Sequence, residues 1–288
     1  MSYQRIEVRP IAGALGAEIG GIDLAGNLDN QVFSEVVQAL HEHLVIFFHD
    51  QKLTPEQHVA FARRFGGLDV HEFVEHMPGH PEIIEVVKEA QEHGRNFGGL
   101  WHSDVTYQER PALGSVLYAK EVPPMGGDTL FANQYLAFEG LSEGMRRLLL
   151  GLKAVHSPNA AYSEEAVRSR GPKELRAIKY TNADKADIET VHPVVRTHPS
   201  TGRRSLFVNQ VFVRRFDGWT EAESKPLLDF LFAHAVRPEF TCRFRWRDNS
   251  VAFWDNRCTQ HFAINDYHGH RRHMHRVTIS GDRPFLAA

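Results

Sequence analysis

The stretches FTCRFRWRDNSVAFW at residues 240–254 and RHMHRVTIS at residues 272–280 decide the fold class. Both contain short runs of aromatic or β-branched residues, which are typical of strands. The first stretch predicts strands over 240–246 and 251–254, and the second predicts a strand over 272–280. Because no helix separates these strands, a regular βαβ alternation is disfavoured, and an antiparallel barrel or jelly roll is favoured.

The rest of the chain adds further short strands and a few helices. Thr54, Pro55 and Gln57 form a capping box with proline at the first helical position, so we expect a helix from there to about residue 65. Other helices are expected after Asp29, over 142–152, and toward residue 232, where Pro226 marks a kink or the true start. Further strands are expected over 5–8, 17–22, 44–48, 101–107, 114–119, 129–132, 191–196 and 206–209. The predicted fold class is mainly β with flanking helices.

Residues 163–190 are polar and charged, and they lack periodic apolar positions. A segment of this length without regular structure is typical of functional loops, so we expect a loop or lid there. No internal repeat or linker divides the rest of the sequence. We therefore expect residues 1–288 to form a single domain with this insertion.

Composition narrows the classes of protein and partner. The 288 residues are 42% hydrophobic and 24% charged, as in soluble globular proteins, and the net charge of -3 gives no polycationic surface for nucleic acid. The sequence contains no run of eighteen apolar residues, so no membrane span is expected. Only two cysteines occur, Cys242 and Cys258, which are expected to be reduced core thiols. These features predict a cytoplasmic location.

The sequence WHSDV at residues 101–105 is the first indication of a metal site. On a strand, side chains two residues apart point to the same side, so His102 and Asp104 would project together. The same pair also fits a hydrogen bond without any ion. We expect His261 to supply a third ligand, because two imidazoles and one carboxylate are typical of non-haem Fe(II) oxygenases.

Arg272 and Arg276 are four residues apart on the predicted strand 272–280, so both should face one cavity. A buried guanidinium needs an anionic partner, and its planar fork suits a carboxylate or sulfonate. The alternative is a solvated basic strand, since Arg271, His273 and His275 lie in the same segment.

Six motifs together resemble the Fe(II)/2-oxoglutarate-dependent dioxygenases of the taurine dioxygenase and aryloxyalkanoate dioxygenase family, over nearly the whole chain. They are LGAEI at 15–19, WHSDVT at 101–106, GGDT at 126–129, HPVVRTHP at 192–199, WDNR at 254–257 with His261, and the pair Arg272 and Arg276. The resemblance implies a double-stranded β-helix (jelly-roll, cupin-like) core. It also implies Fe(II) held by His102, Asp104 and His261, and the 2-oxoglutarate co-substrate held by Arg272 with Thr129. Family members are commonly homodimers or homotetramers.

The resemblance also implies residues for the substrate. His71 and Arg276 match the residues that hold the sulfonate in taurine dioxygenases, and an aromatic residue of the site matches Phe212. Three positions differ from the taurine pocket. This sequence has Val74 where the taurine pocket has a Tyr, Gly98 where it has an Asn, and Tyr162 where it has a Phe. The loss of polar partners at two of them predicts a pocket for a larger, less polar tail.

The predicted function is therefore hydroxylation, by O2, of a carbon of a small organic anion, with decarboxylation of 2-oxoglutarate to succinate and CO2. The substrate is expected to be a taurine-like alkylsulfonate or an aryloxyalkanoate. Two other classes remain at this point: a zinc-dependent hydrolase that uses the same three ligands, and a non-catalytic anion-binding β-barrel.

Overall fold

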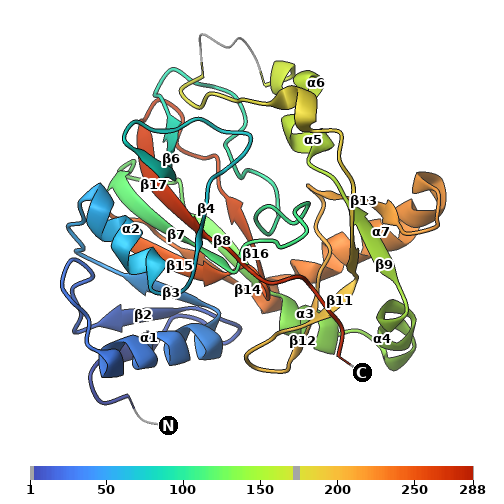
Figure 1. Ribbon diagram of the computed structural model, residues 1–288, viewed down its shortest axis with the longest axis horizontal. Coiled ribbons are helices and arrows are strands. Elements are labelled where there is room, and N and C mark those ends of the chain that lie inside the picture. Colours follow the sequence, from blue (N-terminus) through green and yellow to red (C-terminus); the bar gives the residue numbers. More distant parts are fainter. Residues whose placement is uncertain (1–2, 171–175, 288) are drawn as a thin grey trace.

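Two facing sheets form the centre of the computed structural model, which describes residues 3–170 and 176–287 (Figure 1). Within that part of the chain the larger sheet has nine strands, in the order β1-β2-β3-β15-β7-β17-β6-β5, with β4 paired to β17. The bounds in that order are Glu7–Pro10, Ala17–Gly20, Val45–Phe48, Val251–Asp255, Gly114–Glu121, Arg272–Ile279, His80–Lys88 and His76–Met77, and β4 is Leu68–Asp69. Strands from both ends of the sequence therefore meet in one sheet.

The second sheet is formed by β14 (Thr241–Phe244), β8 (Thr129–Asn133) and β16 (Thr259–Ala263), in that order. An apolar cluster fills the space between the two sheets. In it the ring of Phe47 from β3 stacks on Phe244 from β14 at 3.9 Å, and Phe131 from β8 lies 5.7 Å from Trp254 of β15. These aromatic residues hold the sheets face to face, so their inner side chains share one core.

Helices α1 (Asn30–His43) and α2 (Pro55–Arg63) cover the outer face of the nine-stranded sheet (Figure 1). Both begin where the sequence predicts. The Asp29 side chain accepts a hydrogen bond from the Val32 amide, and the capping box of Thr54 and Gln57 is complete. The left-handed backbone of Leu44 ends α1 and leads directly into β3.

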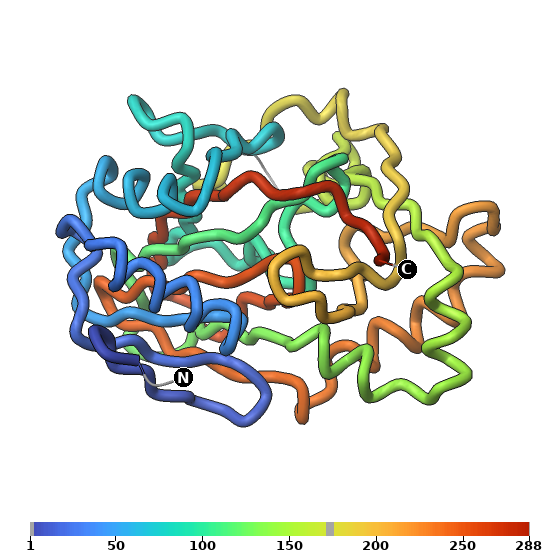
Figure 2. Tube along the Cα trace, turned by 60° about the horizontal axis from the view of Figure 1, so that its bottom comes forward, coloured from blue at the N-terminus to red at the C-terminus, as the bar shows by residue number. Residues whose placement is uncertain are grey.

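A third group of elements lies beside the sheets, on the side where the C-terminus ends (Figure 2). It contains the sheet β10-β9-β13 and the hairpin β11-β12. The strands are Thr190–Pro193, Lys153–His156, Val213–Phe216, Val195–Thr197 and Arg204–Leu206. The helices and 3-10 turns are α3 (Gln134–Glu139), α4 (Glu143–Leu150), α5 (Asn159–Tyr162), α6 (Glu164–Arg168), η2 (Ala183–Lys185), α7 (Glu221–Ala235) and η3 (Pro238–Phe240).

The strand predicted over 101–107 is wrong. His102 makes only an isolated bridge to His261, and the chain then turns at Val105, whose φ is 45°. Pro226 lies inside α7, which begins at Glu221 after a Thr220 capping box, so it does not mark the helix start. Within the predicted loop 163–190 the structure places α6, η2 and the first residue of β10, and residues 171–175 lie outside the described part of the chain. The sequence also gave no indication of β6, β9, β13 or β16.

Two further sequence expectations can be compared with the structure. Cys242 and Cys258 are both buried and free, as expected. Over residues 3–170 and 176–287, none of the helices has both the length and the apolar composition that a membrane crossing requires.

Candidate active site

His102, Asp104 and His261 come together between the two sheets, and all three side chains are buried. Their potential ligand atoms all lie within 4.8 Å of one another. Asp104 Oδ1 is 3.6 Å from His102 Nε2 and 3.8 Å from His261 Nε2. Two backbone hydrogen bonds hold His102 and His261 next to each other. The amide of each residue donates to the carbonyl of the other, at 3.1 and 2.8 Å.

The protonation of these groups suits a cation. His102 Nδ1 lies 2.7 Å from the Leu100 carbonyl, so that nitrogen carries the proton and leaves the Nε2 lone pair free. Burial, and then the neighbouring His102, hold the pKa of His261 well below its usual value, so this imidazole is neutral. Burial alone would raise the pKa of Asp104, but Arg276 and the two histidines bring it well below the usual range. The site therefore offers two imidazole nitrogens and one carboxylate.

A set of hydrogen bonds from β7 and the turn after β15 fixes the Asp104 carboxylate. Ser115 Oγ donates to Asp104 Oδ2 at 2.8 Å. Asn256 accepts from the Asp104 amide at 3.1 Å and from the Trp254 indole at 3.0 Å, and its own amide group lies 3.4 Å from Asp104 Oδ2. Sequence reasoning did not assign these roles, because the partners lie far apart in the chain.

Arg272 supplies a buried positive charge on β17, the strand that also carries Arg276. Among the described residues, its Nε and Nη2 have no hydrogen-bond partner. The Arg272 guanidinium lies 5.7 Å from the Trp246 ring, and the indole of Trp246 donates to Thr129 Oγ1 at 2.9 Å. Gly127 makes room for this side chain, since a Cβ there would lie 3.3 Å from Arg272 Cδ. Unpartnered buried guanidinium donors require an anion, and the distal carboxylate of 2-oxoglutarate fits them.

Arg276 projects from the same face of β17 but contacts the carboxylate ligand itself. Its Nη1 lies 2.8 Å from Asp104 Oδ1, and its guanidinium lies 5.4 Å from the Phe97 ring. The Nε of Arg276 is buried and has no partner among the described residues. Both arginines are therefore buried on one face of β17, which excludes the solvated basic strand that the sequence left open.

A cavity of about 520 Å³ opens beside the metal ligands, and His71, Gly98, Tyr162 and Phe212 help to line it with His102 and Asp104. Val74 is buried but is not among the residues that line this cavity. His71 Nδ1 accepts from the Phe73 amide at 3.2 Å, and its Nε2 lies 3.4 Å from the Tyr162 hydroxyl. Burial, reinforced by Arg276, lowers the pKa of His71 to about 3, so the ring is neutral and can donate from Nε2.

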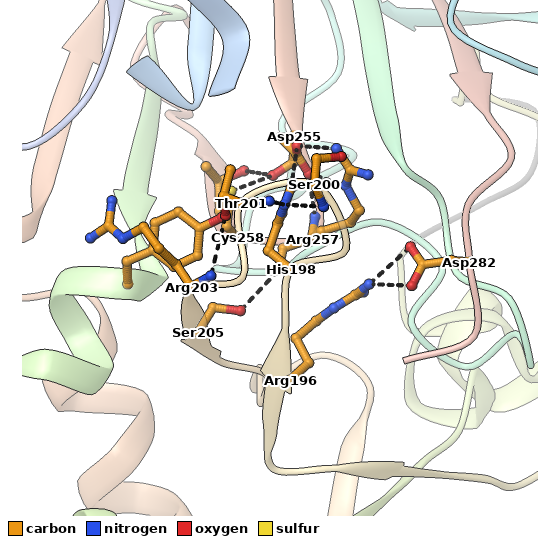
Figure 3. Close-up of polar contacts among 12 residues, drawn as sticks. Arg196, His198, Ser200, Thr201, Arg203, Ser205, Asp255, Arg257, Cys258 and Asp282 are labelled. Carbon is orange, nitrogen blue, oxygen red and sulfur yellow. Dashed lines mark hydrogen bonds and ion pairs between the residues drawn. The ribbon is translucent and has the colours of Figure 1, made fainter. Parts of the chain in front are cut away.

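Polar contacts around Asp255 anchor the turn between β15 and β16 (Figure 3). Asp255 accepts from Arg257 at 2.8 and 2.6 Å and pairs with His198 Nε2 at 3.0 Å. Arg196, on the neighbouring β11, pairs with Asp282 at 2.9 Å. This network fixes the segment that positions Asn256 and His261.

Comparison with known proteins agrees with this geometry. The family model described as "Taurine catabolism dioxygenase TauD, TfdA family" matches residues 7–278. A Pseudomonas putida "alpha-ketoglutarate-dependent sulfate ester dioxygenase" is 37% identical over 97% of this chain and 91% of its own length. An Acinetobacter baylyi "alkylsulfatase" is 35% identical over 97% of this chain and 86% of its own. A solved taurine dioxygenase from Burkholderia xenovorans superposes with a TM-score of 0.82, at 37% identity, over 98% of this chain and 93% of that one.

The fold and the site define a mainly β protein with a buried centre of two histidines and one carboxylate, the ligand set typical of non-haem iron oxygenases. The chain belongs to the TauD/TfdA family of dioxygenases.

Proposed function

We propose that this chain is an Fe(II)- and 2-oxoglutarate-dependent dioxygenase that hydroxylates a carbon of a small organic anion with an apolar tail. One observation carries the proposal: the protein contains both the three candidate ligands and the buried Arg272. The Nε and Nη2 of Arg272 have no hydrogen-bond partner among the described residues. A zinc hydrolase or a passive anion-binding barrel has no need of this second anion site beside the metal. Family membership supports the same reaction class.

We propose that His102, Asp104 and His261 hold Fe(II), and that Arg272 with Thr129 and Trp246 binds the distal carboxylate of 2-oxoglutarate. The two facing sheets would then be the double-stranded β-helix core expected for this family. When bound, the iron and 2-oxoglutarate together supply the oxidising chemistry, with succinate and CO2 as products. The protein's part is to orient the co-substrate and exclude water.

His71 and Arg276 are suited to the anionic head of the substrate. His71 donates from Nε2, and Arg276 offers the guanidinium face that carries the unpartnered Nε. Phe212 and Tyr162 line the same cavity and offer the tail an aromatic surface. Gly98 has no side chain where the taurine pocket has an Asn, and a Cβ there would lie 3.3 Å from the His102 ring.

The relatives' names suggest sulfate esters as one substrate class. Hydroxylation of the carbon that bears the sulfate gives an unstable product, which collapses to an aldehyde and free sulfate. The same step on a sulfonate releases sulfite, and on an aryloxyalkanoate it releases a phenol and a keto acid.

Oxygen uptake and succinate formation by iron-loaded protein test the proposal, with 2-oxoglutarate and a panel of anions. The panel contains taurine, longer alkylsulfonates, alkyl sulfates and both enantiomers of phenoxypropionate. We expect strong stimulation by at least one anion with an apolar tail. Turnover that is indifferent to oxygen and 2-oxoglutarate would contradict the reaction class, and a wide preference for taurine would contradict the pocket assignment.

A further inference from the structure

A second cluster of metal-binding side chains lies on the opposite face of β17 from Arg272 and Arg276. His273 and His275 alternate with the arginines along this strand, so they point away from the active site. Glu85 of the neighbouring strand β6 lies directly opposite His275 in the antiparallel register. The three side chains therefore share one face of the nine-stranded sheet. Helix α2 lies against β6 and β17, the two strands that carry them (Figure 1).

The spacing of the three side chains suits a small divalent ion. Glu85 Oε1 is 3.0 Å from His273 Nε2 and 3.8 Å from His275 Nε2, and the three ligand atoms lie within 4.8 Å of one another. A tetrahedral ion with bonds of about 2.0–2.1 Å keeps its ligand atoms about 3.4 Å apart. The observed distances lie on either side of this value, so small side-chain rotations are enough to complete the geometry.

The exposure and the protonation of these three side chains also favour the binding of an ion. The exposed fractions of the Glu85, His273 and His275 side chains are 37%, 19% and 7%, so an ion can enter and water can take a fourth position. Burial, with the neighbouring His273, lowers the pKa of His275 to about 3, and burial also lowers the pKa of His273. Both rings are therefore neutral near pH 7 and keep their lone pairs.

We propose that Glu85, His273 and His275 form a second binding site, separate from the active site, for a divalent transition metal ion such as Zn²⁺. Imidazole ligands favour Zn²⁺, Cu²⁺ and Ni²⁺ over Mg²⁺ and Ca²⁺, and the single carboxylate adds one compensating charge. The ion would join β6 to β17. It would thereby brace the strand whose other face carries Arg272 and Arg276.

The test counts the Co²⁺ ions bound by metal-stripped protein, by equilibrium dialysis, and records the visible spectrum, because four-coordinate Co²⁺ absorbs much more strongly than six-coordinate Co²⁺. We expect Glu85→Gln and His273→Gln each to remove one equivalent together with the strong absorption. Both residues are partly exposed, so these variants should keep the fold. The matched control is His268→Gln/His270→Gln, which removes two exposed histidines with the same spacing and should leave the count unchanged.

The active-site ion is counted separately with His102→Ala, which should remove one equivalent without the strong absorption. Wild-type protein that lacks the strong absorption, or a Glu85→Gln variant that keeps it, would overturn the second site. A His102→Ala variant that loses no ion would instead contradict the proposed active site.

Discussion

At the scale of single residues, the site depends on charges whose partners are fixed by burial. Arg272 is a clear case, because its guanidinium is buried and its Nε and Nη2 have no hydrogen-bond partner among the described residues. An ion of this kind is stable only if a ligand anion completes its surroundings. The unpartnered donors therefore suit an anionic ligand, as the proposed 2-oxoglutarate site requires.

Replacing Arg272 with Met should raise the KM for 2-oxoglutarate by about 30-fold or more, because truncation of one partner of a buried charge pair costs at least about 2 kcal/mol. Steady-state kinetics with 2-oxoglutarate as the varied substrate measure this change. Arg271→Met is the matched control, since Arg271 points to the other face and pairs with Glu89 and Glu121. An unchanged KM in the Arg272 variant would remove this residue from the co-substrate site.

Ser115 would act on the proposed metal only through Asp104, so it is a positioning residue. Ser115→Ala should weaken Fe(II) binding by about 10- to 100-fold, as is common when a hydrogen bond to a metal ligand is lost. Fe(II) titration measures the affinity, and added iron should restore turnover in the variant. Ser250→Ala is the control, because Ser250 is equally buried but bonds to His49 and Arg247. An equal loss of Fe(II) affinity in the two variants would contradict the role of Ser115, because it would show that removing any buried hydroxyl has this effect.

At the scale of elements, the turn from Asp255 to Cys258 connects the two sheets and leads to His261, the last of the three proposed metal ligands. Burial alone would raise the pKa of Asp255, but Arg257 and His198 bring it well below its ordinary value. A carboxylate with a lowered pKa in the folded protein adds stability above its unfolded pKa of about 4, and that stability is lost as the pH falls further.

Asp255→Asn should lower the free energy of unfolding by about 3–5 kcal/mol at pH 7, because it leaves the charge of Arg257 buried without a partner. The variant should also lose less stability than wild type between pH 5 and about pH 3. Urea unfolding at several pH values measures both effects. Asp229→Asn, which breaks only an exposed pair with Lys225, should change stability by less than about 1 kcal/mol. Parallel pH profiles for wild type and Asp255→Asn would contradict this role.

The same elements show how far sequence reasoning reaches. The capping box at Thr54 and the strand over 251–254 depend on local patterns, and the structure confirms both. The strand over 101–107 was wrong because Val105 adopts a left-handed turn, which its β-branched side chain does not suggest. His102 and His261 were nevertheless proposed together, and their backbones pair. The roles of Ser115 and the Glu85 cluster depend on pairing between distant strands, which no local pattern encodes.

At the scale of the whole molecule, α5, the segment around Gly98 and the segment 210–212 before β13 line one cavity beside His102 and Asp104. Its volume is about 520 Å³, and Phe212 and Tyr162 form an aromatic part of its wall. The enclosure thus favours an anionic head at the metal end and a hydrocarbon tail along the wall.

The length of the substrate's hydrocarbon tail should therefore affect kcat/KM. Across linear alkyl sulfates, kcat/KM should rise about fourfold for each added methylene, which corresponds to about 0.8 kcal/mol of buried CH₂, until the cavity is full. Phe212→Ala should flatten this rise, because it removes part of the apolar wall. A constant kcat/KM from the shortest to the longest ester would contradict the enclosed tail.

The central claim, that the ligands and Arg272 form one site for Fe(II) and 2-oxoglutarate, is tested most directly by anaerobic titration of the Fe(II) protein with 2-oxoglutarate. We predict a visible charge-transfer absorption that saturates at one equivalent of 2-oxoglutarate. Fe(II) protein that binds iron but develops no absorption at saturating 2-oxoglutarate would contradict the claim.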